Sequence, residues 1–115
     1  MTPQAPITGD EVADVLERAA DLIAKPGAWT QGAFARDEHG NHLALARDQR
    51  ARCWCMYGAV VVASDGRHMN AINDLLEGRI GGILSFNDAE NRTQSDVEAA
   101  LREAATAARQ QGVGK

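Results

Sequence analysis

The sequence has few aromatic side chains, few cysteines and no long apolar run. Its 115 residues include two Trp, two Phe, one Tyr and two Cys. No apolar stretch approaches the roughly 20 residues that a membrane-spanning helix needs, and residues 1–8 lack the charged and apolar blocks of a signal peptide. We therefore expect a cytoplasmic protein with no membrane partner, in which both thiols stay reduced.

Positive charge is also scarce. The chain has 12 Lys and Arg against 16 Asp and Glu, which gives a formal net charge of −4. Non-specific nucleic-acid binding is therefore not expected, because such a chain has no general attraction to phosphate backbones. The composition points to no cofactor and leaves the oligomeric state open.

The length and the hydropathy pattern predict a single small domain that is mainly α. A chain of 115 residues with 44% hydrophobic side chains has the usual size of one domain with its own core. We expect about four helices, with at most one short β-hairpin formed by residues 33–36 and 43–45. Residues 8–110 should form the helical domain, with a flexible arm at residues 1–7 and a frayed end at residues 111–115.

The first and last helices have the clearest start signals. Thr8 followed by Glu11 is a capping box, and apolar residues then recur at helical spacing as far as Pro26. Thr93 with Asp96 begins the last helix in the same way. Both helices should bury one face.

The central helix is less sharply defined. Asp48 is a plausible N-cap for a helix that runs to about Ala63 and is apolar on nearly every side, which predicts a central position. A buried strand around Val60–Val62 is the alternative, because these residues are β-branched. A third helix should follow and stop at Gly78, and residues 80–88 should form a loop.

Gly58 lies in the middle of this expected central helix. Glycine there costs on the order of 1 kcal/mol relative to alanine. The position therefore predicts a closely packed neighbour, either Trp29 or the loop that contains Asn87.

All the aromatic bulk lies in three short segments. The segment 52–59 contains both cysteines and two aromatic side chains, and the others are Trp29, Phe34 and Phe86. Burying one aromatic side chain removes roughly 150–250 Å² from water. We therefore expect the three segments to meet, either in the core or around a site.

Three motifs in these segments, taken in order, resemble those of a known family. They are Trp29-Thr30-Gln31-Gly32-Ala33, Cys55-Met56-Tyr57-Gly58-Ala59, and Phe86-Asn87-Asp88 with Arg92-Thr93. Together they are similar to the signature of a family of small uncharacterised bacterial and phage proteins. The resemblance covers about residues 10–108 and implies no activity. Cys53 and the three histidines lie outside the signature.

A thiol nucleophile is one candidate site. Cys55 would be the nucleophile, His42 or His68 the base, and Asn87 or Asp88 the group that orients the base. A cysteine near a helix N-terminus is favoured as thiolate, whereas Cys55 would lie inside a helix capped by Asp48. The alternative is an inert cysteine in the core.

A polar ligand site is the second candidate. Gln31, Asn87, Asp88 and Arg92 would converge beside the aromatic residues, including Trp29, and bind a small polar ligand. The alternative is structural: Asn87 and Asp88 would satisfy loop backbone groups, and Arg92 would pair with a nearby carboxylate.

Two further clusters contain residue types that can form a site. His39, His42, Cys53 and Cys55 are ligand types that zinc accepts, but their spacing is not a standard zinc motif, so no metal site is predicted. The first helix also carries an acidic face, which is either a solvated surface or a site for a basic groove of a partner. Its members are Asp10, Glu11, Asp14, Glu17 and Asp21.

These observations favour a small accessory or regulatory binding protein of phage or mobile-element type. It would act by binding a protein partner or a small polar ligand. The alternative is a small enzyme that uses Cys55 as nucleophile with Asn87 or Asp88.

Overall fold

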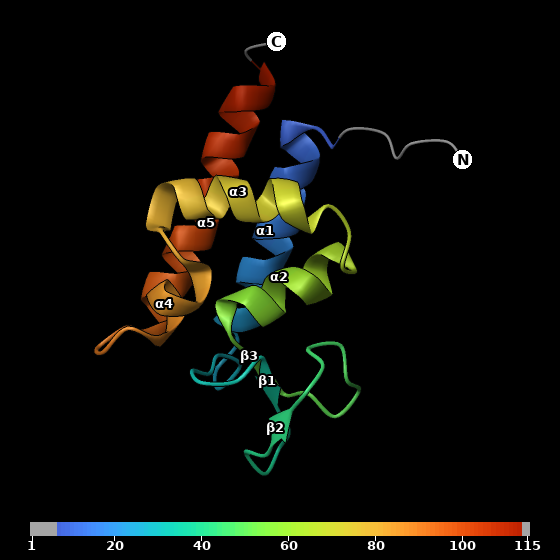
Figure 1. Cartoon of the computed structure of the whole chain (residues 1–115), viewed down its shortest axis with the longest axis vertical. Helices are drawn as coiled ribbons and strands as arrows, with labels where there is room; N and C mark the ends of the chain where they lie inside the picture. The colour runs from blue at the N-terminus through green and yellow to red at the C-terminus, as the bar shows by residue number, and fades with distance from the viewer. Residues whose placement is uncertain (1–6, 114–115) are drawn as a thin grey trace.

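The computed structural model describes residues 7–113 and contains five helices above a small sheet (Figure 1). The helices are α1 (Gly9–Ala24), α2 (Met56–Ser64), α3 (Met69–Ile80), α4 (Ile83–Asp88) and α5 (Gln94–Val113). The strands are β1 (Ala35–Arg36), β2 (His42–Leu43) and β3 (Cys53–Trp54). The predicted mainly α single domain is confirmed, with one helix and one strand more than expected.

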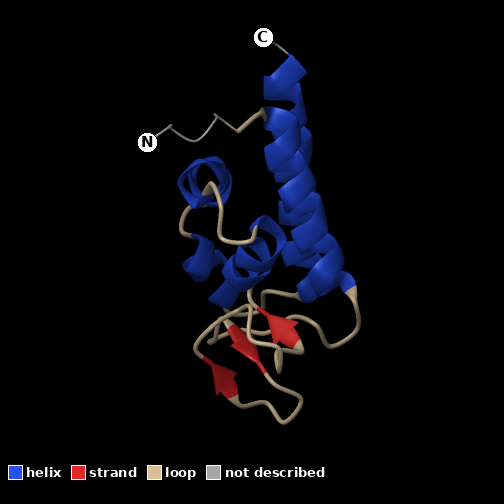
Figure 2. Ribbon diagram, turned by 90° about the vertical axis from the view of Figure 1, so that its right-hand side faces the viewer, coloured by secondary structure: helices blue, strands red, loops and turns tan. Residues whose placement is uncertain are grey.

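The first and last helices form an antiparallel pair that runs the length of the helical part, and the sheet lies beyond one end of this pair (Figure 2). The capping box predicted at Thr8 is present, with the Glu11 N–H donating to Thr8 Oγ1 at 3.1 Å. Gln94, at the start of α5, donates to the backbone carbonyls of Ile23 and Lys25 and so ties the two helices together. The predicted arm lies almost wholly outside the described residues, and α5 continues beyond the predicted limit at residue 110.

The hydrophobic core lies where α2 crosses this pair. Met56, Ala59 and Val60 of α2 are completely buried, as are Leu16 of α1 and Leu101 of α5. The helix α2 is apolar on all sides, as its central position requires. The helices α3 and α4 pack against the remaining sides of this core.

The second helix begins seven residues later than the helix expected from Asp48, at Met56. Asp48 instead closes a local turn, in which its carboxylate accepts hydrogen bonds from the backbone and guanidinium of Arg50. Residues 53–54 pair with β1. The prediction failed because an Asp can accept a hydrogen bond from a nearby backbone N–H in a turn as well as at a helix start. Cys55 therefore caps α2 rather than lying inside it.

The sheet has the order β2-β1-β3 and is antiparallel (Figure 1). Ala35 lies opposite Leu43 in one pair and opposite Trp54 in the other. The predicted hairpin is therefore present, and β3 extends it. The backbone of Trp29 forms a parallel bridge to Trp54 and covers the outer edge of β3.

The loop expected at residues 80–88 is partly helical. Gly81, with a φ of 78°, ends α3, and α4 then runs to Asp88. A helix of six residues is too short to produce a clear apolar period in the sequence.

Aromatic side chains from all three segments pack against the main hydrophobic core, as one of the two alternatives predicted. They are Trp29, Trp54, Tyr57 and Phe86. The rings of Phe34 and Tyr57 are 5.6 Å apart. The outer face of Phe86 is covered by the guanidinium of Arg92, whose Cζ lies 3.8 Å from the ring centroid.

Candidate functional site

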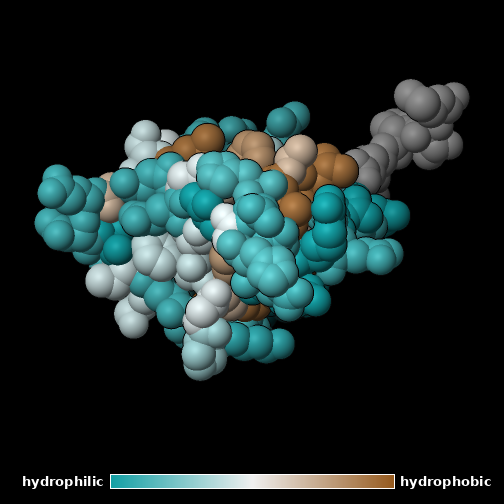
Figure 3. Space-filling view, turned by 90° about the horizontal axis from the view of Figure 1, so that it is seen from below, coloured by the Kyte–Doolittle hydropathy of each residue, from teal (hydrophilic) through white to brown (hydrophobic). Residues whose placement is uncertain are grey.

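A pocket of about 550 Å³ lies between the β1–β2 hairpin and α4. Its lining residues are Gly32, Ala33, Phe34, His42, Leu43, Ala44, Cys55, Leu84 and Asp88. Phe34 is 41% exposed and Leu84 is 48% exposed, so the pocket presents large apolar side chains to solvent. On the sheet side of the molecule, polar side chains dominate and apolar patches show between them (Figure 3).

Among the described lining residues Asp88 is the one carboxylate. Its Oδ1 atom accepts hydrogen bonds from the Gly32 N–H at 3.1 Å and from Asn87 Nδ2 at 2.8 Å. Its Oδ2 atom has no hydrogen-bond partner within the described residues, and the side chain is exposed. One oxygen is thus held by the protein while the other is available to a ligand.

Cys55 lies at the N-cap of α2, and its Sγ atom accepts a hydrogen bond from the Gly58 N–H at 3.3 Å. The side chain is 2% exposed. Burial raises the pKa of the Cys55 thiol, and the negative charge of Asp88 acts in the same direction, against the opposing effect of the Gly58 and Tyr57 N–H groups. The thiol is therefore neutral at neutral pH.

The two histidines proposed as bases lie in different places. His42 is exposed on β2 and lines the pocket that contains Cys55. His68 is the residue before α3, with a φ of 57°, and does not line this pocket. No hydrogen bond within the described residues joins His42 to Cys55 or Asp88, so the predicted triad is not assembled.

Asn87 is completely buried and uses all of its amide in internal hydrogen bonds. Its Oδ1 atom accepts from Trp29 Nε1 at 2.7 Å and from the Met56 N–H at 2.9 Å. Its Nδ2 atom donates to the Thr30 carbonyl at 3.1 Å and to Asp88. Two donors and two lone pairs are the full capacity of an amide, so Asn87 is placed to join three segments rather than to bind a ligand.

The other polar residues of the predicted ligand site also bond internally. Gln31 Nε2 donates to the carbonyls of Asn87 at 2.9 Å and of Ala89 at 3.1 Å. Arg92 Nε donates to the Phe86 carbonyl at 2.8 Å. The structure thus brings Trp29 and Gln31 to Asn87, as the sequence suggested, while Arg92 lies over Phe86 and outside the pocket lining.

Gly58 has the close neighbour that its position in a helix predicted. The neighbour is the backbone of Phe34, not Trp29 or the Asn87 segment. A Cβ atom at Gly58 would overlap the Phe34 carbonyl oxygen and lie 3.2 Å from its carbon. The same oxygen accepts a hydrogen bond from the Cys55 N–H at 3.2 Å, so this contact fixes the pocket wall against α2.

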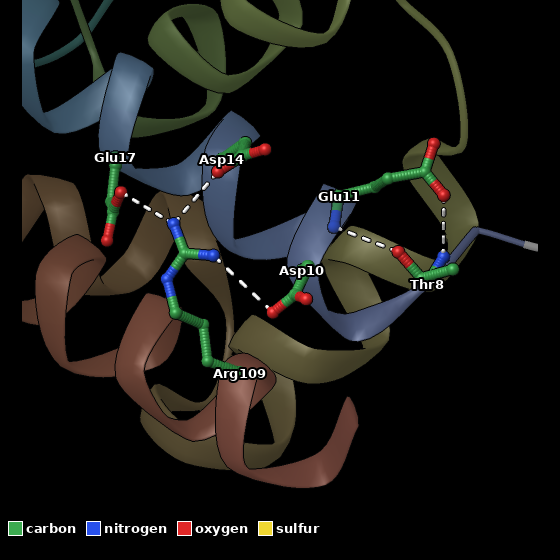
Figure 4. Close-up of polar contacts among 6 residues, drawn as sticks. All are labelled: Thr8, Asp10, Glu11, Asp14, Glu17 and Arg109. Atoms are coloured by element: carbon green, nitrogen blue, oxygen red, sulfur yellow. Dashed lines mark hydrogen bonds and ion pairs between the residues drawn. The ribbon is translucent and has the colours of Figure 1, made fainter. Parts of the chain in front are cut away.

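The two remaining clusters do not form open sites. Within the described residues, no group of three or more His, Cys, Asp or Glu side chains is placed to hold a metal ion. Arg109 of α5 reaches the acidic face of α1 and binds Asp14 at 2.8 Å and Glu17 at 2.9 Å, with Asp10 at 3.5 Å (Figure 4). The acidic face is therefore part of the contact between α1 and α5.

The apolar walls of the pocket were not among the predicted site residues. Phe34 was assigned to the aromatic cluster, and Leu84 lies on a helix that was expected to be a loop. No sequence signal distinguishes their exposure from burial. By contrast, Cys55 and Asp88, which the sequence did single out, both line the pocket.

The helices of the described residues include none that is long and apolar enough to cross a membrane. The family model described as a family of unknown function, DUF6197, matches residues 7–107. This range contains every pocket-lining residue, and the match agrees with the resemblance to an uncharacterised family. No curated protein and no solved structure matches the chain significantly.

Proposed function

We propose that this chain, which belongs to the DUF6197 family of unknown function, is a binding protein whose pocket accepts an apolar chain with a cationic end. The observation that carries the proposal is the arrangement of the pocket. Phe34, Leu43 and Leu84 offer an apolar wall, and the free Oδ2 atom of Asp88 offers one negatively charged acceptor. Binding pockets commonly combine an apolar lining with a few polar groups that fix orientation.

The charge around the pocket supports a cationic end rather than an anionic one. No Lys or Arg is among its described lining residues. The raised pKa of Cys55 keeps the thiol neutral, so Asp88 provides the negative charge of the pocket at neutral pH. A primary ammonium on an apolar stem, as in a small amine or a lysine side chain, fits this lining. The ammonium can bind the carboxylate, and the stem can contact the apolar wall.

A titration with n-pentylammonium, followed by the backbone amide signals of the protein in NMR, tests this proposal. The expected result is a set of shifts confined to residues 32–34, 42–44 and 84–88. The neutral n-pentanol, which has the same stem, should bind at least about tenfold more weakly because it cannot form the charge-assisted hydrogen bond. Equal binding of the two, or shifts elsewhere, would refute the proposal.

Two variants sharpen the test. Asp88→Asn keeps the acceptor for Gly32 and Asn87 but removes the charge, so the preference for the ammonium should disappear. Leu84→Ser should weaken both compounds, because it removes an apolar wall. Leu45→Ser is its matched control, since Leu45 is 69% exposed and lies outside the lining. An equal loss in Leu45→Ser would show that the Leu84 effect is not specific to the pocket.

A second candidate is the small cysteine enzyme, because the pocket brings Cys55, His42 and Asp88 to one lining. Its chemistry requires a thiolate, and the raised pKa of Cys55 opposes this. The reaction of the native protein with iodoacetamide, followed residue by residue by mass spectrometry, separates the two functions. Fast alkylation of Cys55 near pH 7 would support the enzyme. Protection of Cys55 until the protein unfolds would support binding alone.

The cellular role follows from the same proposal. The chain would act in the cytoplasm as an accessory or regulatory protein, with a protein or a small molecule as its ligand. Its connection with phages or mobile elements stays a prediction from the family resemblance.

A further inference from the structure

We propose that the ligand is an extended segment of a protein partner, which pairs with the free edge of β2 and places a lysine side chain in the pocket. The inference rests on the proposed function and names its partner. Peptides that add a strand to an exposed sheet edge gain affinity from backbone hydrogen bonds and specificity from pockets for alternate side chains.

The backbone of β2 presents hydrogen-bonding groups away from β1. The Asp37 N–H donates to the Asn41 carbonyl at 3.0 Å, so this pair is a hydrogen-bonded one. Bonded and non-bonded pairs alternate along an antiparallel ladder. The next pair, Arg36 with His42, is therefore non-bonded, and the N–H and C=O of His42 point outward. By the same alternation the Leu43 groups face β1, and Ala44 lies in a bend just beyond the strand.

This edge is the open one. On the other side of the sheet, the Trp54 N–H donates to the Ala28 carbonyl at 2.9 Å and the Thr30 N–H donates to the Trp54 carbonyl at 3.1 Å. That edge is therefore covered by residues 28–30. Within the described residues, β2 has β1 as its one neighbour in the sheet (Figure 2). His42 and Ala44 are exposed.

The edge lacks two of the residue types that limit pairing at exposed strands. Proteins protect edge strands with lysine, proline or inward charges, or by keeping them very short. Residues 42–45 read His-Leu-Ala-Leu and contain neither lysine nor proline. The two-residue length of β2 is the protection that this edge has, so an added strand would gain its backbone hydrogen bonds mainly from His42.

The pocket adjoins this edge directly, since His42, Leu43 and Ala44 all line it. Side chains of a paired strand alternate between the two faces of the sheet, so one side chain of the added strand can enter the pocket. A lysine side chain matches the lining, because its stem contacts apolar side chains while its ammonium reaches Asp88. The negative charge of Asp88 thus selects a basic position in the partner segment.

The probe that tests the inference is the peptide acetyl-Thr-Val-Lys-Val-Thr-amide, titrated into the unmodified protein and followed by NMR. We expect it to bind at least about tenfold more tightly than n-pentylammonium, because it adds backbone hydrogen bonds to the same side-chain contact. The amide proton of His42 should shift and exchange more slowly with solvent. Norleucine in place of lysine should weaken binding by about tenfold or more.

Backbone methylation provides a matched pair of control peptides. One peptide is N-methylated at both valines, and the other at the lysine and both threonines. Successive N–H groups of an extended chain point to opposite sides, so one of these peptides keeps the pairing edge and the other loses it. We expect one to bind like the parent and the other about tenfold more weakly. Two methylated peptides that both bind like the parent would overturn the inference.

The failure of this inference is distinguishable from that of the proposed function. If n-pentylammonium binds at the pocket but the parent peptide binds no more tightly, the strand pairing is wrong and the pocket function stands. If n-pentylammonium does not bind at the pocket, the proposed function fails and the inference fails with it.

Discussion

The side-chain oxygen of Asn87 lies 2.7 Å from the indole nitrogen of Trp29 and accepts a hydrogen bond from it. The same oxygen accepts a hydrogen bond at 2.9 Å from the N–H of Met56, the first residue of α2. One buried amide therefore fixes the positions of α4, the start of α2 and the segment after α1 relative to one another. Asp88, the next residue, gains its position in the pocket from this junction.

Replacement of Asn87 should lower stability strongly. In Asn87→Asp the two amide donors are lost, the Thr30 carbonyl is left without its partner and a charge is buried next to Asp88. We expect the free energy of unfolding in urea to fall by at least about 3 kcal/mol. Asn70→Asp, at an exposed position of α3, is the matched control and should change it little. Similar values for the two variants would show that the junction is not a major source of stability.

Gly58→Ala should also destabilise the protein, because its Cβ atom would overlap the Phe34 carbonyl oxygen. Relief of the overlap requires the pocket wall to shift, at a cost of about 1–3 kcal/mol. Gly78→Ala is the matched control on α3, where an added Cβ meets no atom within 4 Å. Helix propensity predicts that this control gains up to about 1 kcal/mol. The two variants should therefore move the melting temperature in opposite directions.

The Cys55 thiol should make stability fall at alkaline pH. Its pKa is raised in the folded protein, so its contribution is fully present below the unfolded pKa of about 8.5 and is lost as pH rises through the folded pKa. As pH rises from about 7 through the unfolded pKa of about 8.5, the free energy of unfolding of the wild type should fall more than that of Cys55→Ser, which does not titrate. Parallel curves for the two proteins would mean that the thiol is not held neutral.

Arg109 should stabilise the pair of α1 and α5 in a salt-dependent manner. Its hydrogen bonds to Asp14 and then Glu17 raise the pKa of the guanidinium, which shows a net attraction in the folded state. We expect Arg109→Gln to lower the melting temperature at low ionic strength, and the difference from wild type to shrink in about 0.5 M NaCl, because salt screens exposed ion pairs. Arg67→Gln replaces an exposed arginine outside this cluster and is the control. A loss independent of salt would point to lost packing instead.

The parts of the fold that were predictable are those with local signals. The capping boxes at Thr8 and Thr93 and the apolar stripes after them correctly located α1 and α5. The start of α2 was not predictable, because Asp48 forms a turn that competes with helix capping. The strand β3 has its backbone partners in residues 34–36, and a pairing across that distance leaves no local pattern in the sequence.

The polar residues of the candidate site could be singled out from the sequence, but their roles could not. The sequence singled out Cys55, Asn87 and Asp88 together, and the structure places them side by side. Burial and hydrogen bonds decide their separate roles. The thiol is neutral, the amide uses all of its hydrogen-bonding groups internally, and the carboxylate keeps one oxygen free. These arise from contacts between distant segments, which composition and spacing do not encode. The apolar walls were missed for the same reason.

The pairing of α1 with α5 has a consequence for how the chain folds during synthesis. The apolar stripe of α1 is synthesised before α5, the helix that covers most of it. Until α5 has left the ribosome, the central helix α2 is the main cover of the stripe. Exposed apolar surface of this kind promotes aggregation of partly made chains. Chains truncated before residue 94 should therefore associate with chaperones rather than fold.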